Sequence, residues 1–240
     1  MADIDLTDLA AGHNGSRKLS GYLARPSGDG PWPGVAMIHE AFGLNDVMRR
    51  QADRLAAAGF LTLAPDLFSA GGAVRCLVTT MRAMLAGQGR AFGDIEAARQ
   101  WLLGSADCTG KVGIIGFCMG GGFALVAAGS GFDAAAPNYG MLPRDLDAAM
   151  EGVCPVVASY GGKDFSLRNA AVKLDAALTK AGVEHDVKEY PTAGHAFLND
   201  TLAGPAPVRL LSKVSGMVPE PAAAEDAWKR IDLFFRQHLG

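Results

Sequence analysis

Short apolar runs alternate with amphipathic stretches along most of this 240-residue chain. From residue 18 onward, seven runs have the length of β-strands, and several of them are continuously apolar rather than alternating. Continuous apolar runs are typical of strands that are buried on both faces, as in parallel sheets. The predicted strands are residues 18–24, 34–38, 60–64, 111–116, 134–138, 153–160 and 184–190.

Between these strands, apolar residues recur at helical spacing. Asn45 can cap a helix over residues 46–58, and Gly59 can end it. Further helices are predicted at 92–103, at 167–181 (with Leu167, Ala171, Leu174 and Leu178 on one face), at 223–238 and directly after residue 118. Strands that alternate with helices predict an α/β fold, with a doubly wound, mostly parallel sheet and helices on both faces. We expect one α/β domain over residues 1–240.

Composition and charge narrow the function classes. The chain is 49% hydrophobic with 22 basic and 25 acidic residues, which is ordinary for a globular protein and provides no basic surface for nucleic acid. No apolar run is long enough to span a membrane, and the acidic N-terminus does not resemble a signal peptide. The four cysteines are far apart, and no residues show metal-ligand spacing. We expect a cytoplasmic monomer or small homo-oligomer without metal or cofactor, acting on a small molecule rather than a nucleic acid or membrane.

The strongest chemical signal is the segment Gly116-Phe117-Cys118-Met119-Gly120, between a predicted strand and a small-residue helix. It has the G-x-nucleophile-x-G pattern of a sharp strand-to-helix turn, with cysteine as the nucleophile. The glycines on either side let the strand and helix pass without Cβ clashes. Free N–H groups at the helix start can then hold an oxyanion.

The same segment has two alternative interpretations. A dinucleotide-binding G-x-G-x-x-G loop would put Cys118 where the middle glycine lets the backbone approach a pyrophosphate, and no acidic residue lies near position 138 to bind the ribose. A buried structural thiol is the second alternative, since cysteine is among the most often buried residues.

Candidate catalytic partners for Cys118 follow it along the chain in the order nucleophile, acid, histidine that accompanies this kind of turn. Asp164 comes directly after the strand predicted at 153–160, and His195 follows the strand at 184–190. Both therefore lie at the carboxyl edge of the sheet, where α/β folds bind ligands. We predict that Cys118 attacks an acyl carbon, that His195 moves the proton and that Asp164 orients the imidazole. The Met119 N–H, with a second N–H from the loop after residue 38, would hold the oxyanion.

Together, several motifs resemble the dienelactone hydrolase family across residues 18–239. They are His-Glu40-Ala-Phe-Gly-Leu, Ala-Pro-Asp-Leu-Phe at 64–68, Gly-Phe-Cys118-Met-Gly-Gly, Asp164 and Gly-His195-Ala-Phe. The resemblance implies an α/β-hydrolase fold, hydrolysis of enol-lactones or related esters, a Glu40 that contacts and helps activate the thiol, and an oxyanion N–H from Ala41. A solvated loop carboxylate is the alternative for Glu40.

The resemblance is incomplete at the residues that would bind the substrate. Family members that degrade chloroaromatics bind a substrate carboxylate with arginines, and Asn199 stands where one of them would be. Arg75 or Arg82 could supply the other. Phe42, Arg75, Phe197 and Asn199 are therefore our candidate substrate contacts, and we expect a natural substrate other than the chlorinated dienelactone.

Residues 198–221 form a long segment without a predicted strand, and this segment begins three residues after His195. We predict that its apolar piece at 208–214 is a short helix or lid over the pocket; a surface loop on the sheet edge is the alternative. The function predicted for the whole chain is thiol-dependent ester or lactone hydrolysis. A catalytically silent hydrolase fold that binds a partner, or a redox role for Cys118, are the alternatives.

Overall fold

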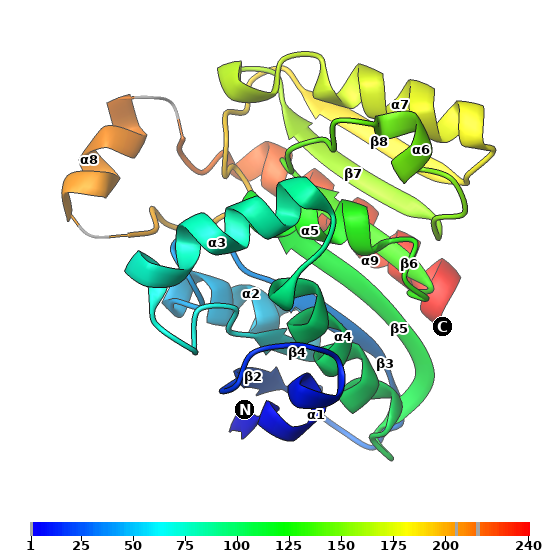
Figure 1. The fold of residues 1–240 in the computed structure, drawn as a ribbon. Helices are drawn as coiled ribbons and strands as arrows, with labels where there is room; N and C mark the ends of the chain where they lie inside the picture. Colours follow the sequence, from blue (N-terminus) through cyan, green and yellow to red (C-terminus); the bar gives the residue numbers. More distant parts are fainter. Residues whose placement is uncertain (1, 205, 215–216) are drawn as a thin grey trace.

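The computed structural model describes residues 2–204, 206–214 and 217–240 (Figure 1). Its centre is a sheet with strand order β1-β2-β4-β3-β5-β6-β7-β8. β2 pairs antiparallel with β1 and β4, and the other neighbours are parallel. The strands are β1 (Ala2–Asp5), β2 (Ser20–Ala24), β3 (Trp32–Ile38), β4 (Leu61–Pro65), β5 (Cys108–Phe117), β6 (Ala134–Asn138), β7 (Val156–Gly161) and β8 (His185–Tyr190).

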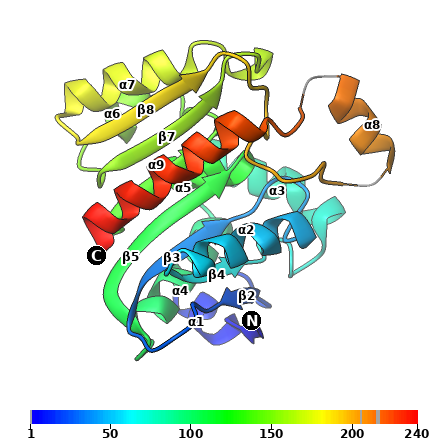
Figure 2. The ribbon, with the colours of Figure 1, turned by 180° about the vertical axis from the view of Figure 1, so that it is seen from behind.

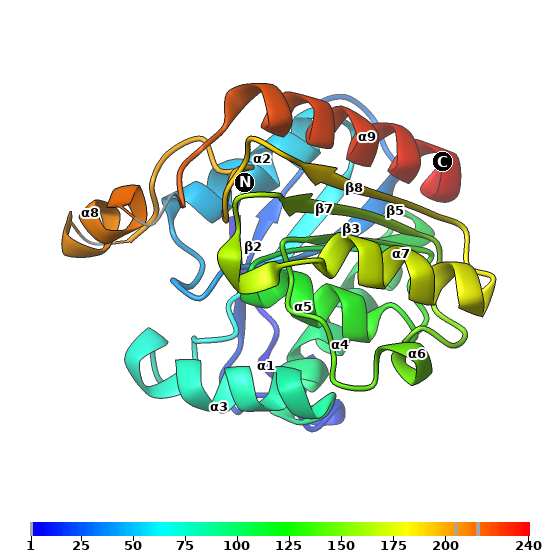
Figure 3. The ribbon, with the colours of Figure 1, turned by 90° about the horizontal axis from the view of Figure 1, so that it is seen from above.

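Helices cover both faces of this sheet, as the alternating pattern predicts. α2 (Asp46–Ala57) and α9 (Pro221–Leu239) lie on one face (Figures 2 and 3). The opposite face carries α1 (Thr7–Gly12), α3 (Ala73–Ala86), α4 (Arg90–Leu103), α5 (Met119–Ala127), α6 (Leu146–Ala149) and α7 (Ala170–Ala181). α8 (Ala206–Val214) lies off the end of the sheet toward which the parallel strands point (Figure 1).

The continuous apolar strands are buried on both faces. In β3, Val35 and Met37 pack into the core beneath α2 and α9, while Ala36 and Ile38 pack into the core on the other face. All four side chains are fully buried. Because successive side chains of a strand point to opposite faces, a strand between two helical layers needs apolar residues at every position.

Some elements differ from the sequence prediction. The N-terminal residues form β1 and α1, which the sequence pattern did not predict. β1 has only four residues, two of them acidic, and it is stabilised by pairing with β2. α3 was not predicted. α7 begins at Ala170 rather than at 167, because Asn169 has φ 60° in the left-handed region and separates it from a short 3-10 helix, Phe165–Leu167. β7 begins after Pro155, which has no N–H for the sheet.

The parallel strands bring five loops to one edge of the sheet. β3, β5, β6, β7 and β8 are followed by Glu40, Cys118, Tyr139, Asp164 and His195 respectively. Within the described residues, no helix combines the length and apolar character needed to cross a membrane. The same part of the chain contains no group of three or more His, Cys, Asp or Glu side chains arranged to hold a metal ion.

Candidate active site

Cys118 occupies a strained turn between β5 and α5. Its backbone has φ 54° and ψ −115°, a conformation that residues with a Cβ rarely adopt. The turn requires glycine nearby: a Cβ on Gly116 would overlap the Gly120 carbonyl, and a Cβ on Gly120 would overlap the Ile38 carbonyl. This close packing of strand, turn and helix explains the glycine spacing and presents the Cys118 side chain at the start of α5. A buried structural thiol does not fit this position, since Cys118 lines a cavity and is only partly buried.

His195 and Asp164 are directly hydrogen-bonded at the ends of β8 and β7. The His195 Nδ1 lies 2.5 Å from Asp164 Oδ2. The other carboxylate oxygen, Oδ1, accepts hydrogen bonds from the Ser166 N–H at 3.0 Å and the Ser166 hydroxyl at 2.6 Å. Burial would raise the pKa of Asp164, but the bonds from His195 and Ser166 outweigh it and lower that pKa. Asp164 is therefore an ionised acceptor that fixes the orientation of the imidazole.

The environment of His195 favours its cationic form. Burial would lower the pKa of His195, but the hydrogen bond with Asp164 and the neighbouring Cys118 sulfur raise it to about 10. With Nδ1 directed at Asp164, Nε2 is the ring nitrogen left for the neighbouring Cys118. Cys118, His195 and Asp164 thus lie in one row at three separate strand ends, with a hydrogen bond between His195 and Asp164.

Glu40 is buried beside this row and is not a solvated loop carboxylate. Its side chain is 2% exposed, and Oε1 accepts a hydrogen bond of 3.0 Å from Asn199 Nδ2. Burial raises the pKa of Glu40, and this effect is opposed by Asn199, by the charge of His195 and by Tyr139. Asn199 was a candidate substrate contact; here its amide nitrogen is engaged with Glu40.

Two backbone N–H groups are positioned to hold an oxyanion. The Met119 N–H is the first of α5 and so has no partner within the helix. The carbonyl of Glu40 accepts hydrogen bonds from His39 Nδ1 at 2.7 Å and from the Gly43 N–H at 3.0 Å. Because C=O and N–H point in opposite directions across a trans peptide, these bonds also set the direction of the Ala41 N–H.

His39 holds this loop as a neutral ring. Its Nε2 accepts a hydrogen bond of 3.1 Å from the Leu67 N–H, so the proton resides on Nδ1. Burial lowers the pKa of His39, which keeps the ring uncharged. The side chain therefore links the loop after β3 to the turn after β4.

Tyr139 is a site residue that the sequence analysis did not identify. It is fully buried, has φ 39°, and its ring centroid lies 5.1 Å from that of His195. Burial and the nearby charges of Glu40 and Cys118 raise its pKa well above the usual value for tyrosine. Within the described part of the chain its hydroxyl has no hydrogen-bond partner of normal geometry. The sequence feature that could have identified Tyr139 as a site residue is its position directly after a predicted strand.

A small cavity opens onto these residues. It has a volume of about 130 Å³ and is lined by Glu40, Cys118, His195 and Asn199 together with Ala41 and Phe42. Ser212 and Met217, from α8 and the segment after it, also line it. The piece predicted as a helix is thus helical and forms part of the cavity wall, whereas a role in closing the site stays a prediction.

Two predicted substrate contacts lie elsewhere. Phe197 is fully buried against Tyr139 and Tyr190, and Arg75 is on the exposed side of α3. Among the residues that the structure describes, neither lines the cavity beside Cys118. Phe42 does line it and is 42% exposed.

The layered sheet and the strained strand-to-helix turn at Cys118 define an α/β-hydrolase fold. Residues 19–239 match the model of the dienelactone hydrolase family, and the chain belongs to that family. Two curated relatives are each named "Putative carboxymethylenebutenolidase". The one from Azospirillum brasilense is 31% identical over 98% of this chain and 100% of its own length; that from Methylorubrum extorquens is 29% identical over 92% and 77%.

Solved structures agree with this assignment. A dienelactone hydrolase-like promiscuous phosphotriesterase from metagenomic libraries superposes with a TM-score of 0.80 at 26% identity, covering 100% of this chain and 98% of that one. The family membership makes this protein a hydrolase related to the carboxymethylenebutenolidases.

Proposed function

We propose that this protein hydrolyses carboxylic esters or lactones through a Cys118-His195-Asp164 triad and a covalent acyl-thioester. The observation that carries the proposal is the 2.5 Å hydrogen bond between His195 and Asp164 beside Cys118, which occupies the strained turn before α5 and lines the same cavity as His195. A nucleophile, a base and an orienting acid in this order are the arrangement that acyl transfer requires.

The reaction has two steps. The Cys118 sulfur attacks the acyl carbon, and the oxygen that becomes negative is held by the Met119 and Ala41 N–H groups. The carbon–oxygen bond to the alcohol then breaks, and protonated His195 donates its Nε2 proton to the leaving oxygen. In the second step, neutral His195 takes a proton from water, and the resulting hydroxide attacks the thioester carbon. The carbon–sulfur bond then breaks, the carboxylic acid leaves, and Cys118 is released as a thiolate beside protonated His195.

Glu40 and Tyr139 lie beside Cys118 and His195 in the proposed site. Burial raises the pKa of Glu40, which makes its carboxylate a stronger proton acceptor than a solvated one. In this proposal Glu40 accepts the thiol proton before the sulfur attacks, and it returns the proton to the sulfur after the acid has left.

Enol-lactones and simple esters are the substrates to test first, since the named relatives are carboxymethylenebutenolidases. Asn199 is an uncharged amide that is hydrogen-bonded to Glu40, so it supplies no positive charge to bind a substrate carboxylate. We therefore infer a natural substrate other than the chlorinated dienelactone. A phosphotriester belongs in the panel, because one structural relative is titled a promiscuous phosphotriesterase.

Hydrolysis of p-nitrophenyl acetate by the wild type and by Cys118→Ala tests the proposal. We expect the variant to lose at least about 10³-fold in kcat, and the wild type to gain the mass of one acetyl group during the first turnover. Cys108→Ala is the matched control: this half-buried cysteine begins β5 at the opposite end of the strand from Cys118. The control should keep full activity.

Equal rates in the wild type and Cys118→Ala would refute the proposed function. A redox role for Cys118 receives little support from the other thiols, because Cys108 and Cys154 lie at the amino ends of β5 and β7. Formation of an oxidised Cys118 without any acyl adduct would nevertheless favour that alternative over hydrolysis.

A further inference from the structure

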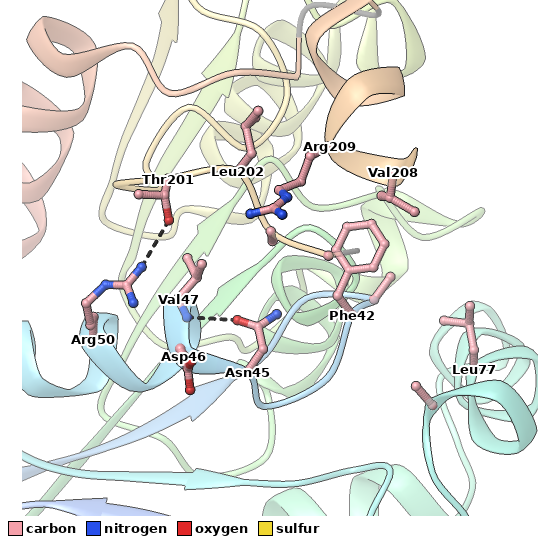
Figure 4. Close-up of a pocket in the computed structure, with 14 residues that line it drawn as sticks. Phe42, Asn45, Asp46, Val47, Arg50, Leu77, Thr201, Leu202, Val208 and Arg209 are labelled. Atoms are coloured by element: carbon pink, nitrogen blue, oxygen red, sulfur yellow. Dashed lines mark hydrogen bonds between the residues drawn. The ribbon is translucent and has the colours of Figure 1, made fainter. Parts of the chain in front are cut away.

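The cavity beside Cys118 adjoins a second, larger cleft between α8, α2 and α3 (Figure 4). We call this the outer cleft. Its volume is about 650 Å³, and it shares Ala41, Phe42, Thr201, Leu202 and Ala203 with the smaller cavity. The outer cleft therefore lies next to the proposed site of reaction.

The sizes of the two spaces indicate which parts of a substrate each can hold. Sites that enclose drug-sized ligands have volumes of roughly 300–1,000 Å³. The inner cavity, at about 130 Å³, holds only the reacting group and its nearest atoms, whereas the outer cleft, at about 650 Å³, falls in that range. A substrate larger than a simple acetate must extend into the outer cleft.

The walls of the outer cleft are mainly apolar. Phe42, Leu77 and Val208 come from three different segments, and Figure 4 shows all three side chains facing the same opening. Phe42 is 42% exposed, although it is a large hydrophobic residue. Apolar side chains left exposed in a concave surface lose water when an apolar group binds, which favours binding of such a group.

The charged residues of the outer cleft do not create an anion site. Arg50 donates hydrogen bonds of 2.5 and 2.9 Å to Asp200, which neutralises it. Asp46 contributes a negative charge at the start of α2. Arg209 lines the cleft from an exposed turn of α8 and has no ion pair among the described residues. Because solvent screens a single exposed arginine, the mainly apolar cleft fits an uncharged group better than a carboxylate.

The position of His195 decides which part of the substrate enters. The inner cavity and the outer cleft share residues 41–42 and 201–203. In the proposed mechanism the leaving oxygen must face His195, which lines the inner cavity, whereas Ala41, whose N–H is proposed to hold the oxyanion, lines both spaces. The group on the other side of the acyl carbon is the acyl chain. We propose that the outer cleft binds the acyl chain of the ester substrate, an uncharged apolar chain of about six carbons or more. This inference rests on the proposed ester hydrolysis at Cys118.

Acyl-chain selectivity tests the proposal. We would measure kcat/KM of the wild type for p-nitrophenyl acetate, butyrate, hexanoate and octanoate. Each buried methylene contributes about 0.8 kcal/mol, or about fourfold, so we expect a rise of at least about tenfold from acetate to hexanoate. A parallel series of acetate esters with longer alcohols should show less than about threefold change.

Substitutions on one helix make the test specific. Val208→Asp puts a charge in the outer cleft and should lower the hexanoate-to-acetate ratio of kcat/KM at least about fivefold. Leu210→Asp is the matched control on the same helix: Leu210 is 66% exposed and, among the described residues, is not part of the cleft lining. The control should keep the wild-type ratio. Val208→Ser provides a milder second variant, expected to lower the ratio about twofold.

The outcomes separate the two proposals. A flat acyl series, equal ratios in Val208→Asp and Leu210→Asp, or a dependence on alcohol length instead would overturn the outer-cleft assignment while Cys118-dependent hydrolysis stands. Faster turnover of a carboxylate-terminated acyl chain than of hexanoate would also overturn it. Failure of the wild type to hydrolyse any ester, or no effect of Cys118→Ala, would refute the proposed function and the acyl-chain assignment with it.

Discussion

Replacing Glu40 by glutamine should make the protein more stable and less active at neutral pH. Glu40 is 2% exposed, and Asn199, a neutral amide, donates the 3.0 Å hydrogen bond to Oε1. A glutamine keeps that acceptor and removes the buried charge. The same charge is what we propose assists Cys118.

The size of the stability effect follows from this burial. Protein substitutions place the cost of an inadequately compensated buried polar group at about 1–3 kcal/mol. We therefore expect Glu40→Gln to raise the free energy of unfolding by about 1–3 kcal/mol. For a chain of this size, that corresponds to a Tm increase of about 3–9 °C. Activity toward p-nitrophenyl acetate should fall by about 10²–10⁴-fold, the usual contribution of a group that moves a proton.

The gain in stability should depend on pH with a definite sign. Burial raises the pKa of Glu40 above its ordinary value, so the folded protein holds this proton more tightly than the unfolded chain. Wild-type stability is therefore lost as the pH rises from about 4.5 through the raised pKa, and the glutamine variant escapes this loss. The difference between the two proteins should be smallest near pH 4 and should grow as the pH rises through the raised pKa of Glu40.

Thermal unfolding followed by circular dichroism at several pH values, combined with steady-state kinetics, measures both effects. Glu189→Gln is the matched control, because Glu189 is exposed on β8, and its stability should stay within about 0.5 kcal/mol of the wild type. Lower stability of Glu40→Gln at neutral pH with activity retained would refute the reasoning. Glu40 would then be a structural residue whose charge is well compensated.

Two further predictions concern the turn and the histidine. Gly120→Ala should prevent stable folding or cost more than about 4 kcal/mol, because its Cβ would overlap the Ile38 backbone carbonyl, which cannot move away; a Tm near that of the wild type in differential scanning calorimetry would contradict this. Asp164→Asn should return the pKa of His195 from about 10 toward its ordinary 6.5. In the wild type the stability from His195 is fully present below about pH 6.5 and is lost as the pH rises to about 10, so imidazole NMR titration should show a neutral ring at pH 8 in the variant alone.

The sequence alone determined the features that depend on local spacing. Buried parallel strands require continuous apolar runs, so β3, β5 and β7 were visible in the pattern, and Cys118 and Asp164 were found because they follow β5 and β7. His195 was found because it lies in the loop after β8, an edge strand with a mixed pattern. The roles of the glycines beside Cys118 could also be predicted, since a Cβ at these positions would overlap nearby backbone and their spacing around the turn is visible in the sequence. These relations hold within one strand and the turn after it, so no distant contact is needed to infer them.

Only the tertiary structure decided how distant residues act on one another. Glu40 and Asn199 are 159 positions apart, and nothing near either residue indicates that they bond or that Glu40 is buried. Tyr139 became a site residue because β6 ends beside β5, and β1 formed because β2 was available to pair with it. The outer cleft likewise combines α2, α3 and α8, which are far apart in the chain. Burial, pKa and cavity shape depend on which segments meet in space, and one sequence read along its length does not specify those meetings.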